Sequence, residues 1–169
     1  MKNLTLTALA LLALSTAAPV LAQSKGTISA TRPEELASAM KEAGFKAELK
    51  RADGENPSID TEFSGWTSTV YLMDCDAESH AKCQSVMLRT GFNRKEPMPA
   101  ELVNEIVSKQ RYLALSLDDE GDPWADWDIV TGDGIPKATF FLALRKYAEQ
   151  VDALSERVFA EERATDDDD

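Results

Sequence analysis

Carboxylate side chains dominate one stretch of this sequence and are the first candidates for chemistry. Seven acidic residues lie within 118–133, and Asp126 and Asp128 would point to the same side of a strand. Paired carboxylates can cleave glycosidic bonds, and clustered ones can hold Ca²⁺. An EF-hand loop starting at Asp118 would need Gly at its sixth position and Glu at its twelfth, where this sequence has Pro and Ile. A solvated acidic surface therefore explains the stretch better than an enzyme does.

The acidic stretch leaves open one alternative function, a small protein that responds to calcium or zinc. Its candidate ligands are Asp118, Glu120, Asp122, Asp126 and Asp128. Cys75, His80 and Cys83 form a second candidate group. Structural zinc sites bring four ligands at recognised spacings, which this single cluster matches poorly. Metal binding is therefore the alternative and not the main expectation.

Other catalytic motifs are missing from the sequence. His80 is the only histidine, and no Ser or Cys nucleophile motif accompanies it. No Gly-rich loop has the spacing that binds phosphates. We therefore expect no catalytic residue, no cofactor and no enzymatic activity.

The N-terminus has the layout of a secretory signal. Residues 1–3 carry one cation, residues 4–18 are apolar, and residues 19–22 end on small side chains. A membrane anchor is the alternative, but no cationic stop-transfer cluster flanks the apolar run. We expect cleavage after Ala22 and a periplasmic or secreted protein that is not inserted in a membrane.

The two cysteines of the chain favour a disulfide in such a compartment. Cys75 and Cys83 bracket a polar loop between two strand-like segments. An even number of cysteines in an exported chain favours pairing. We expect a disulfide at the mouth of a hairpin, which would stabilise the fold by about 2.5 kcal/mol.

Composition limits the class of protein and of partner. The chain has 169 residues, of which 43% are hydrophobic and 28% charged, as in ordinary globular domains. Its formal net charge of -12 repels phosphate backbones and anionic lipids. Nucleic acid is therefore excluded as an expected partner, and a protein or peptide is favoured.

Hydrophobic periodicity divides the chain into helices and strands. A capping box of Thr31 and Glu34 would start the first helix. The predicted helices cover 31–44, 99–110 and a long final segment, and the predicted strands cover 45–50, 58–63, 66–73, 84–92, 111–117 and 124–131. The apolar stripe of the final helix consists of Phe140, Leu144, Tyr147, Val151, Leu154 and Val158.

These elements predict a single domain over 31–163, preceded by a flexible lead-in over 23–30 and followed by an acidic tail over 164–169. Their order is α-β(3 or 4)-α-β-β-α. Helices that bracket an antiparallel sheet favour a two-layer α+β sandwich with the helices on one face of the sheet.

The other face of that sheet is the candidate site. Successive side chains of a strand point to opposite faces, so each strand contributes one set of residues to the helices and one to the other side. The second set mixes aromatic, Met and charged side chains, as contact surfaces do. The candidate partner-binding face consists of Tyr71, Met73, Met87, Arg89, Trp124 and Asp126. The alternative is that a terminus or the long helix covers these residues.

The chain resembles the YbjN family of bacterial proteins, which is similar in fold to type III secretion chaperones. The resemblance rests on residues 44–49, on 111–123, and on Asp126 and Asp128. The cysteine pair is familiar from exported members, and of the family's Asn-x-Trp-Asn pattern this chain keeps Asn104. The resemblance implies a non-enzymatic, chaperone-like or regulatory role and names no ligand. We therefore expect an exported module that recognises a protein or peptide, with a homodimer through the sheet or the long helix left open.

Overall fold

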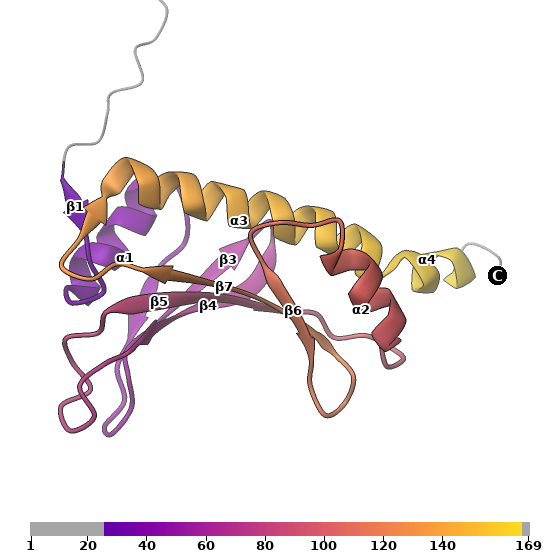
Figure 1. Cartoon of the computed structure of the whole chain (residues 1–169), viewed down its shortest axis with the longest axis horizontal. Helices are drawn as coiled ribbons and strands as arrows, with labels where there is room; N and C mark the ends of the chain where they lie inside the picture. The colour runs from indigo at the N-terminus through magenta and orange to yellow at the C-terminus, as the bar shows by residue number, and fades with distance from the viewer. Residues whose placement is uncertain (1–25, 167–169) are drawn as a thin grey trace, which may run out of the picture.

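The computed structural model describes residues 26–166 (Figure 1). The predicted signal peptide, 1–22, and the end of the predicted tail, 167–169, lie outside the described residues. The strands are β1 (Thr27–Ile28), β2 (Glu48–Lys50), β3 (Ser58–Phe63), β4 (Trp66–Met73), β5 (Ser85–Gly91), β6 (Ala114–Leu117), β7 (Pro123–Val130) and β8 (Ile135–Pro136). The helices are α1 (Pro33–Glu42), α2 (Ala100–Val107), α3 (Lys137–Val158) and α4 (Ala160–Asp166).

Six strands form one antiparallel sheet in the order β2-β3-β4-β5-β7-β6, and β1 pairs with β8 in a separate ribbon. Figure 1 shows α3 extending along one side of the sheet, with α1 near one of its ends and α2 near the other. Loops project from the strand ends to the opposite side. The predicted α+β class with an antiparallel sheet is confirmed. The similarity in fold to type III secretion chaperones stays a prediction.

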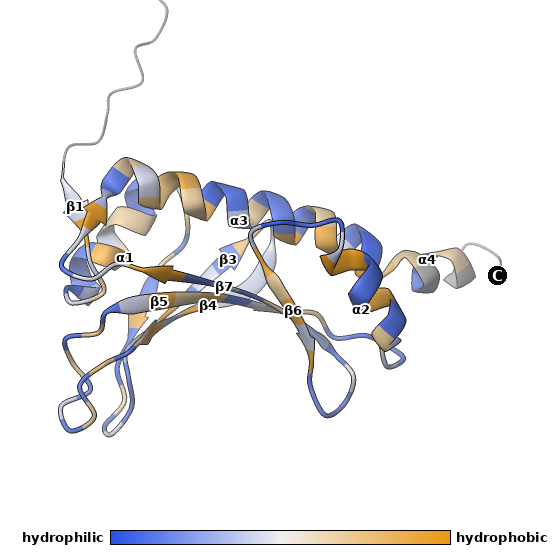
Figure 2. Cartoon of the chain, in the orientation of Figure 1, coloured by the Kyte–Doolittle hydropathy of each residue, from blue (hydrophilic) through white to orange (hydrophobic). Residues whose placement is uncertain are grey.

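The core lies between α3 and the sheet. Val70 and Leu72 of β4 and Leu88 of β5 are fully buried. Every residue of the predicted α3 stripe is fully buried as well, namely Phe140, Leu144, Tyr147, Val151, Leu154 and Val158. Figure 2 shows the corresponding alternation of hydrophobic and hydrophilic segments along α3. Burying one large apolar side chain contributes about 2 kcal/mol, so this layer supplies most of the stabilisation.

The described part of the predicted lead-in over 23–30 pairs with β8 and packs on the domain. Ile28 is 4% exposed and packs into the core, and Ala30 is also buried. The hydroxyl of Ser29 donates to the carbonyl of Gly132 at 2.6 Å, and the amide of Ala30 donates to Thr131 Oγ1 at 2.9 Å. This segment is ordered because β8 supplies strand pairing and the β7–β8 turn satisfies its polar groups.

The capping box predicted for the first helix is also wrong. The N-cap of α1 is Arg32, which makes no side-chain cap hydrogen bond. The hydroxyl of Thr31 lies 2.8 Å from that of Ser29, and the carboxylate of Glu34 accepts from Arg51 at 2.5 Å. Both side chains of the expected box are therefore engaged elsewhere, while Pro33 still begins the helix.

Two predicted strands are shorter than expected. Before β2, the hydroxyl of Thr61 donates to the carbonyl of Lys46 at 2.7 Å, so a side chain binds this segment where strand pairing would. Before β6, Tyr112 has a φ of 65°, which interrupts an extended strand. The strands consequently begin at Glu48 and Ala114.

The predicted acidic tail does not start at residue 164, because α4 continues to Asp166. Phe159, between α3 and α4, stacks on Trp66 with ring centroids 5.4 Å apart. A carboxylate oxygen of Glu162 lies 3.2 Å from Nε of Arg94, whose side chain is 3% exposed. These contacts join the start of α4 to β4 and to the segment that follows β5.

Candidate partner-binding face

The face of the main sheet opposite α3, which we call the open face, brings the predicted site residues together. Strand pairing places Tyr71 opposite Met87, and Arg89 opposite Asp126. Tyr71 is 38% exposed, whereas its strand neighbours point into the core and are fully buried. Among the described residues, α3 packs against the other face of the sheet and therefore does not cover Tyr71.

Three rows of side chains cross the open face from strand to strand. The first runs through Ser58, Tyr71, Met87 and Asp128. The second runs through Asp60, Thr69, Arg89 and Asp126. The third consists of the pairs Glu62–Thr67 and Gly91–Trp124, and Thr67 and Gly91 line the same pocket. Apolar, hydroxyl and charged groups are therefore interleaved across the middle of the sheet.

Trp124 is half-buried because it lies against a glycine of the next strand. A Cβ on Gly91 would come within 2.8 Å of two carbons of the indole ring. The indole Nε1 donates to a carboxylate oxygen of Asp118 at 2.9 Å. The guanidinium of Arg89 lies 4.6 Å from the ring centroid, a cation–π distance. Trp124 is thus held in one orientation on the open face.

Arg89 and Asp126 form a widely spaced charge pair beside this indole. Nε of Arg89 lies 3.5 Å from Oδ1 of Asp126, too far for a good charge-assisted hydrogen bond. That oxygen is buried and has no hydrogen-bond partner among the described residues. Burial raises the pKa of Asp126, Arg89 opposes the rise, and the charge of Asp128 adds to it. The carboxylate is therefore incompletely neutralised by the described residues.

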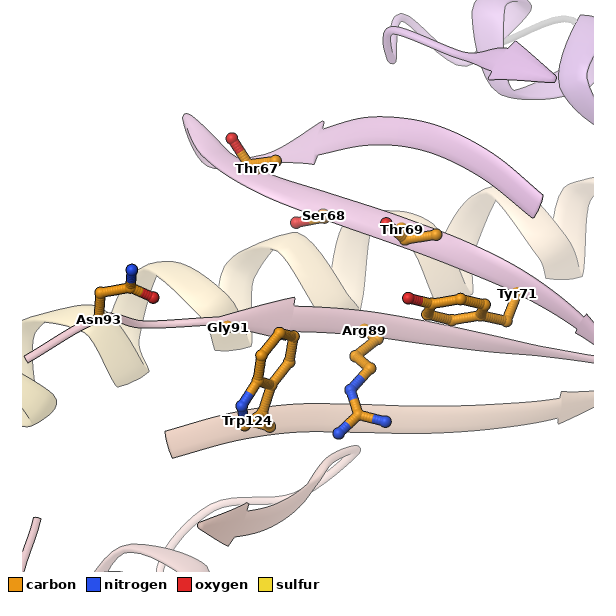
Figure 3. A pocket seen from close by; sticks show the side chains of 8 residues that line it. All are labelled: Thr67, Ser68, Thr69, Tyr71, Arg89, Gly91, Asn93 and Trp124. Atoms are coloured by element: carbon orange, nitrogen blue, oxygen red, sulfur yellow. The ribbon is translucent and has the colours of Figure 1, made fainter. Parts of the chain in front are cut away.

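A shallow pocket of about 230 Å³ opens on the same surface (Figure 3). Its lining residues are Thr67, Ser68, Thr69, Tyr71, Arg89, Gly91, Asn93 and Trp124. Hydroxyl, amide, guanidinium and aromatic groups suit recognition of another molecule by hydrogen bonding and stacking. Gly91 and Asn93 were missed from the sequence, although a glycine inside a strand is a signal of close approach.

A buried polar cluster lies beneath the pocket and joins α3 to the sheet. The hydroxyl of Tyr147 donates to the carbonyl of Ala125 at 2.7 Å and lies 3.1 Å from Oγ1 of Thr90. The Thr90 hydroxyl is in turn 2.8 Å from that of Ser68. Burial, the largest cause, raises the pKa of Tyr147 well above its ordinary value. The cluster fixes α3 over the strands that carry Arg89 and Trp124.

The acidic hairpin, which consists of β6, β7 and the turn between them, has a turn held largely by hydrogen bonds from backbone amides. The carboxylate of Asp118 accepts from the amides of Glu120 and Asp122 at 3.0 and 2.9 Å, besides the indole of Trp124. The indole, above all, and these amides hold the pKa of Asp118 below its usual range. Asp122 accepts from the amide of Arg94 at 2.8 Å. Asp118 and Asp122 therefore shape a turn.

The proposed metal ligands are not gathered into a site. Within residues 26–166, no group of three or more His, Cys, Asp or Glu side chains is placed to hold a metal ion. The Sγ atoms of Cys75 and Cys83 lie 2.09 Å apart, which is the separation in a disulfide, so the predicted pair forms. Nδ1 of His80 lies 3.0 Å from Oδ1 of Asn56, outside any cysteine cluster.

Comparison with known families gives one finding. The model of the YbjN family, described as "Putative bacterial sensory transduction regulator", matches residues 32–160. Searches of curated proteins and of solved structures gave no match. Across the described part of the chain, no helix combines the length and apolar character needed to cross a membrane.

Proposed function

Because the chain belongs to the YbjN family, we propose that it is an exported, non-enzymatic regulator that binds a protein or peptide partner on its open face. The family description is that of a regulator and fits a regulatory or binding role. The observation that carries the proposal is the open face itself. Its aromatic, Met and charged side chains stand on a sheet whose opposite face is fully used by the core.

The open face has the properties of a recognition surface. Tyr71 and Met87 offer apolar contact, and Trp124 is held by Asp118 and Gly91 before any partner arrives. A side chain that is already ordered loses little conformational entropy on binding. Arg89 adds a charged group next to the indole, and aromatic and Arg side chains are those enriched at binding hot spots.

Export is supported by the N-terminal signal layout and by the disulfide, which is stable in oxidising compartments. The protein accumulated by its native host should therefore begin at Gln23. Intact mass and N-terminal sequencing of the periplasmic fraction test this directly. A full-length protein that starts at Met1 and remains with the cytoplasm would contradict export.

Site-specific photo-crosslinking in the native host tests the binding face. A photoreactive amino acid at Tyr71 should give a discrete crosslinked product with a second protein. The matched control is Leu142, which is 51% exposed on α3. Products from Leu142 alone, or the same products from both positions, would contradict a role for the open face.

A further inference from the structure

We propose that the segment bound by the open face is cationic, with lysine or arginine side chains alternating with apolar ones. This inference rests on the proposed function and adds the chemistry of the partner. The evidence is the charge that the open face leaves uncompensated, together with the apolar side chains that lie between its carboxylates.

The charges of the open face do not cancel. Its strand positions carry five acidic residues, namely Glu48, Asp60, Glu62, Asp126 and Asp128. The basic residues there are Lys50 and Arg89, with Lys46 just before β2. Lys46 pairs with Glu62 at 2.5 Å, and Lys50 lies 2.5 Å from Glu48 and 3.6 Å from Asp60. The peripheral β2–β3 side of the face is therefore largely paired.

The uncompensated charge lies on β7. Asp128 is exposed and has no ion-pair partner among the described residues. Asp126 shares only the long contact to Arg89, and one of its oxygens lacks a hydrogen-bond donor within the described chain. The two carboxylates are close enough for the charge of Asp128 to raise the pKa of Asp126. An incoming cation would neutralise this pair where the described residues do not.

Apolar side chains surround these carboxylates. Met87 pairs across the strands with Asp128, and Tyr71 lies beyond it in the same row. Val130, one step along the same face of β7, is 75% exposed. Carboxylates separated by apolar groups match a segment whose own cationic and apolar side chains alternate.

The same charges disfavour the competing occupants. A two-fold contact between the open faces of two copies would bring two surfaces with an excess of acidic residues together, and like charges at an interface cost affinity. Acidic peptides and anionic lipid would meet the same repulsion. A cationic segment of another protein is the occupant that the charges favour.

Binding of labelled synthetic peptides to the purified protein, followed by fluorescence anisotropy, tests the inference. Three peptides of equal length alternate Lys with Val, Lys with Ser, or Glu with Val. The Lys–Val peptide should bind most tightly and weaken as salt is raised, because screening reduces exposed charge interactions. The Lys–Ser peptide should bind more weakly, and the Glu–Val peptide should not bind.

Paired charge variants separate this face from general attraction to an acidic protein. D126N with D128N should weaken Lys–Val binding by about fivefold. The matched control is D133N with D152N, which makes the same change in net charge at two exposed positions without side-chain partners among the described residues. It should leave the affinity nearly unchanged, and thermal melting should show both proteins folded.

Three results would contradict a cationic binding segment. These are absence of Lys–Val binding at low salt, equal weakening by both variant pairs, and Glu–Val binding as tight as Lys–Val binding. If the Glu–Val peptide bound that tightly and its binding were lost in Y71A, the open face would still be a docking surface. Only the proposed cationic character of the partner would then be wrong. The crosslinking comparison of Tyr71 with Leu142 decides the proposed function independently.

Discussion

The two faces of the main sheet differ sharply in how far their side chains are buried. Val70 and Leu72 are fully buried against the helical layer, while Tyr71 between them is 38% exposed. Across the partner strand, buried Leu88 stands between the open-face residues Met87 and Arg89. The same backbone therefore carries a buried, stabilising face and a partly exposed face, because the side-chain period of a strand is two.

The two faces also differ in whether their polar groups have hydrogen-bond partners. On the core face, the Tyr147 hydroxyl donates to the carbonyl of Ala125, and the Thr90 hydroxyl bonds to those of Tyr147 and Ser68, so this buried polar cluster is satisfied. On the open face, Asp126 keeps an oxygen without a donor among the described residues. The two faces therefore differ in the burial of their side chains and in the satisfaction of their polar groups, and the following predictions test these differences.

The largest expected effect comes from shortening neighbouring side chains on β5. L88A should lower the free energy of unfolding by about 3 kcal/mol, because it leaves a cavity in the core. M87A should cost less than about 1 kcal/mol, because its side chain lies on the open face. Urea denaturation of both variants measures the contrast, and equal losses would refute the assignment of the two faces.

A smaller loss is expected from the buried polar cluster. Y147F removes the hydroxyl that donates to Ala125, which should cost about 1–2 kcal/mol because the carbonyl is left unpaired. Burial raises the folded-state pKa of Tyr147 above its unfolded value, so its contribution is lost as pH rises past the unfolded value of about 10. Wild type should therefore lose its advantage over Y147F in strongly alkaline buffer, followed by chemical denaturation. An unchanged difference there would argue against a buried neutral tyrosine.

Substitution of Gly91 should destabilise the fold for a reason specific to the open face. G91A would place a methyl group against the indole of Trp124 and should destabilise the fold by about 1 kcal/mol. S116A, in the same row beyond Trp124, should change stability by less than about 0.5 kcal/mol. Thermal melts of the pair give the answer, and a neutral G91A would mean that Trp124 does not rest on β5.

The smallest expected effects come from substituting two aspartates of one hairpin. The two substitutions should shift the melting temperature in opposite directions. The pKa of Asp118 is lowered, so its stabilisation is present above the unfolded pKa near 4 and lost as pH falls through the folded value. The pKa of Asp126 is raised, so its charge opposes folding near neutral pH and this penalty disappears on acidification. At pH 7, D118N should lower the melting temperature and D126N should raise it slightly. Melts repeated at pH 3 should show both differences reduced, and equal signs at pH 7 would contradict the assignment.

Much of this contrast was predictable from the sequence. Alternation of Val70 and Leu72 with Tyr71 assigned both faces of β4, and the repeat from Phe140 to Val158 placed α3 on one of them. These patterns are strong because each element buries one side only. The disulfide followed from a count of two cysteines.

Other features depend on contacts between distant segments. The two residues of β1 are too few for any periodicity, and their order comes from pairing with β8. The position of Trp124 over Gly91 depends on the register of β5 against β7, which no local pattern specifies. The hydrogen bond from that indole to Asp118 likewise turns a candidate metal ligand into part of a turn.

The central claim is that the open face is the surface covered by a partner, and two tyrosines of the unmodified chain test it most directly. Tyr71 on the open face is 38% exposed, and Tyr112, whose ring centroid lies 5.3 Å from that of Trp127, is 46% exposed. Radical footprinting should compare the protein in its native cells with the purified protein. We predict that Tyr71 is protected in cells while Tyr112 is labelled equally in both samples. Unchanged labelling of Tyr71, or protection of Tyr112 alone, would contradict the account.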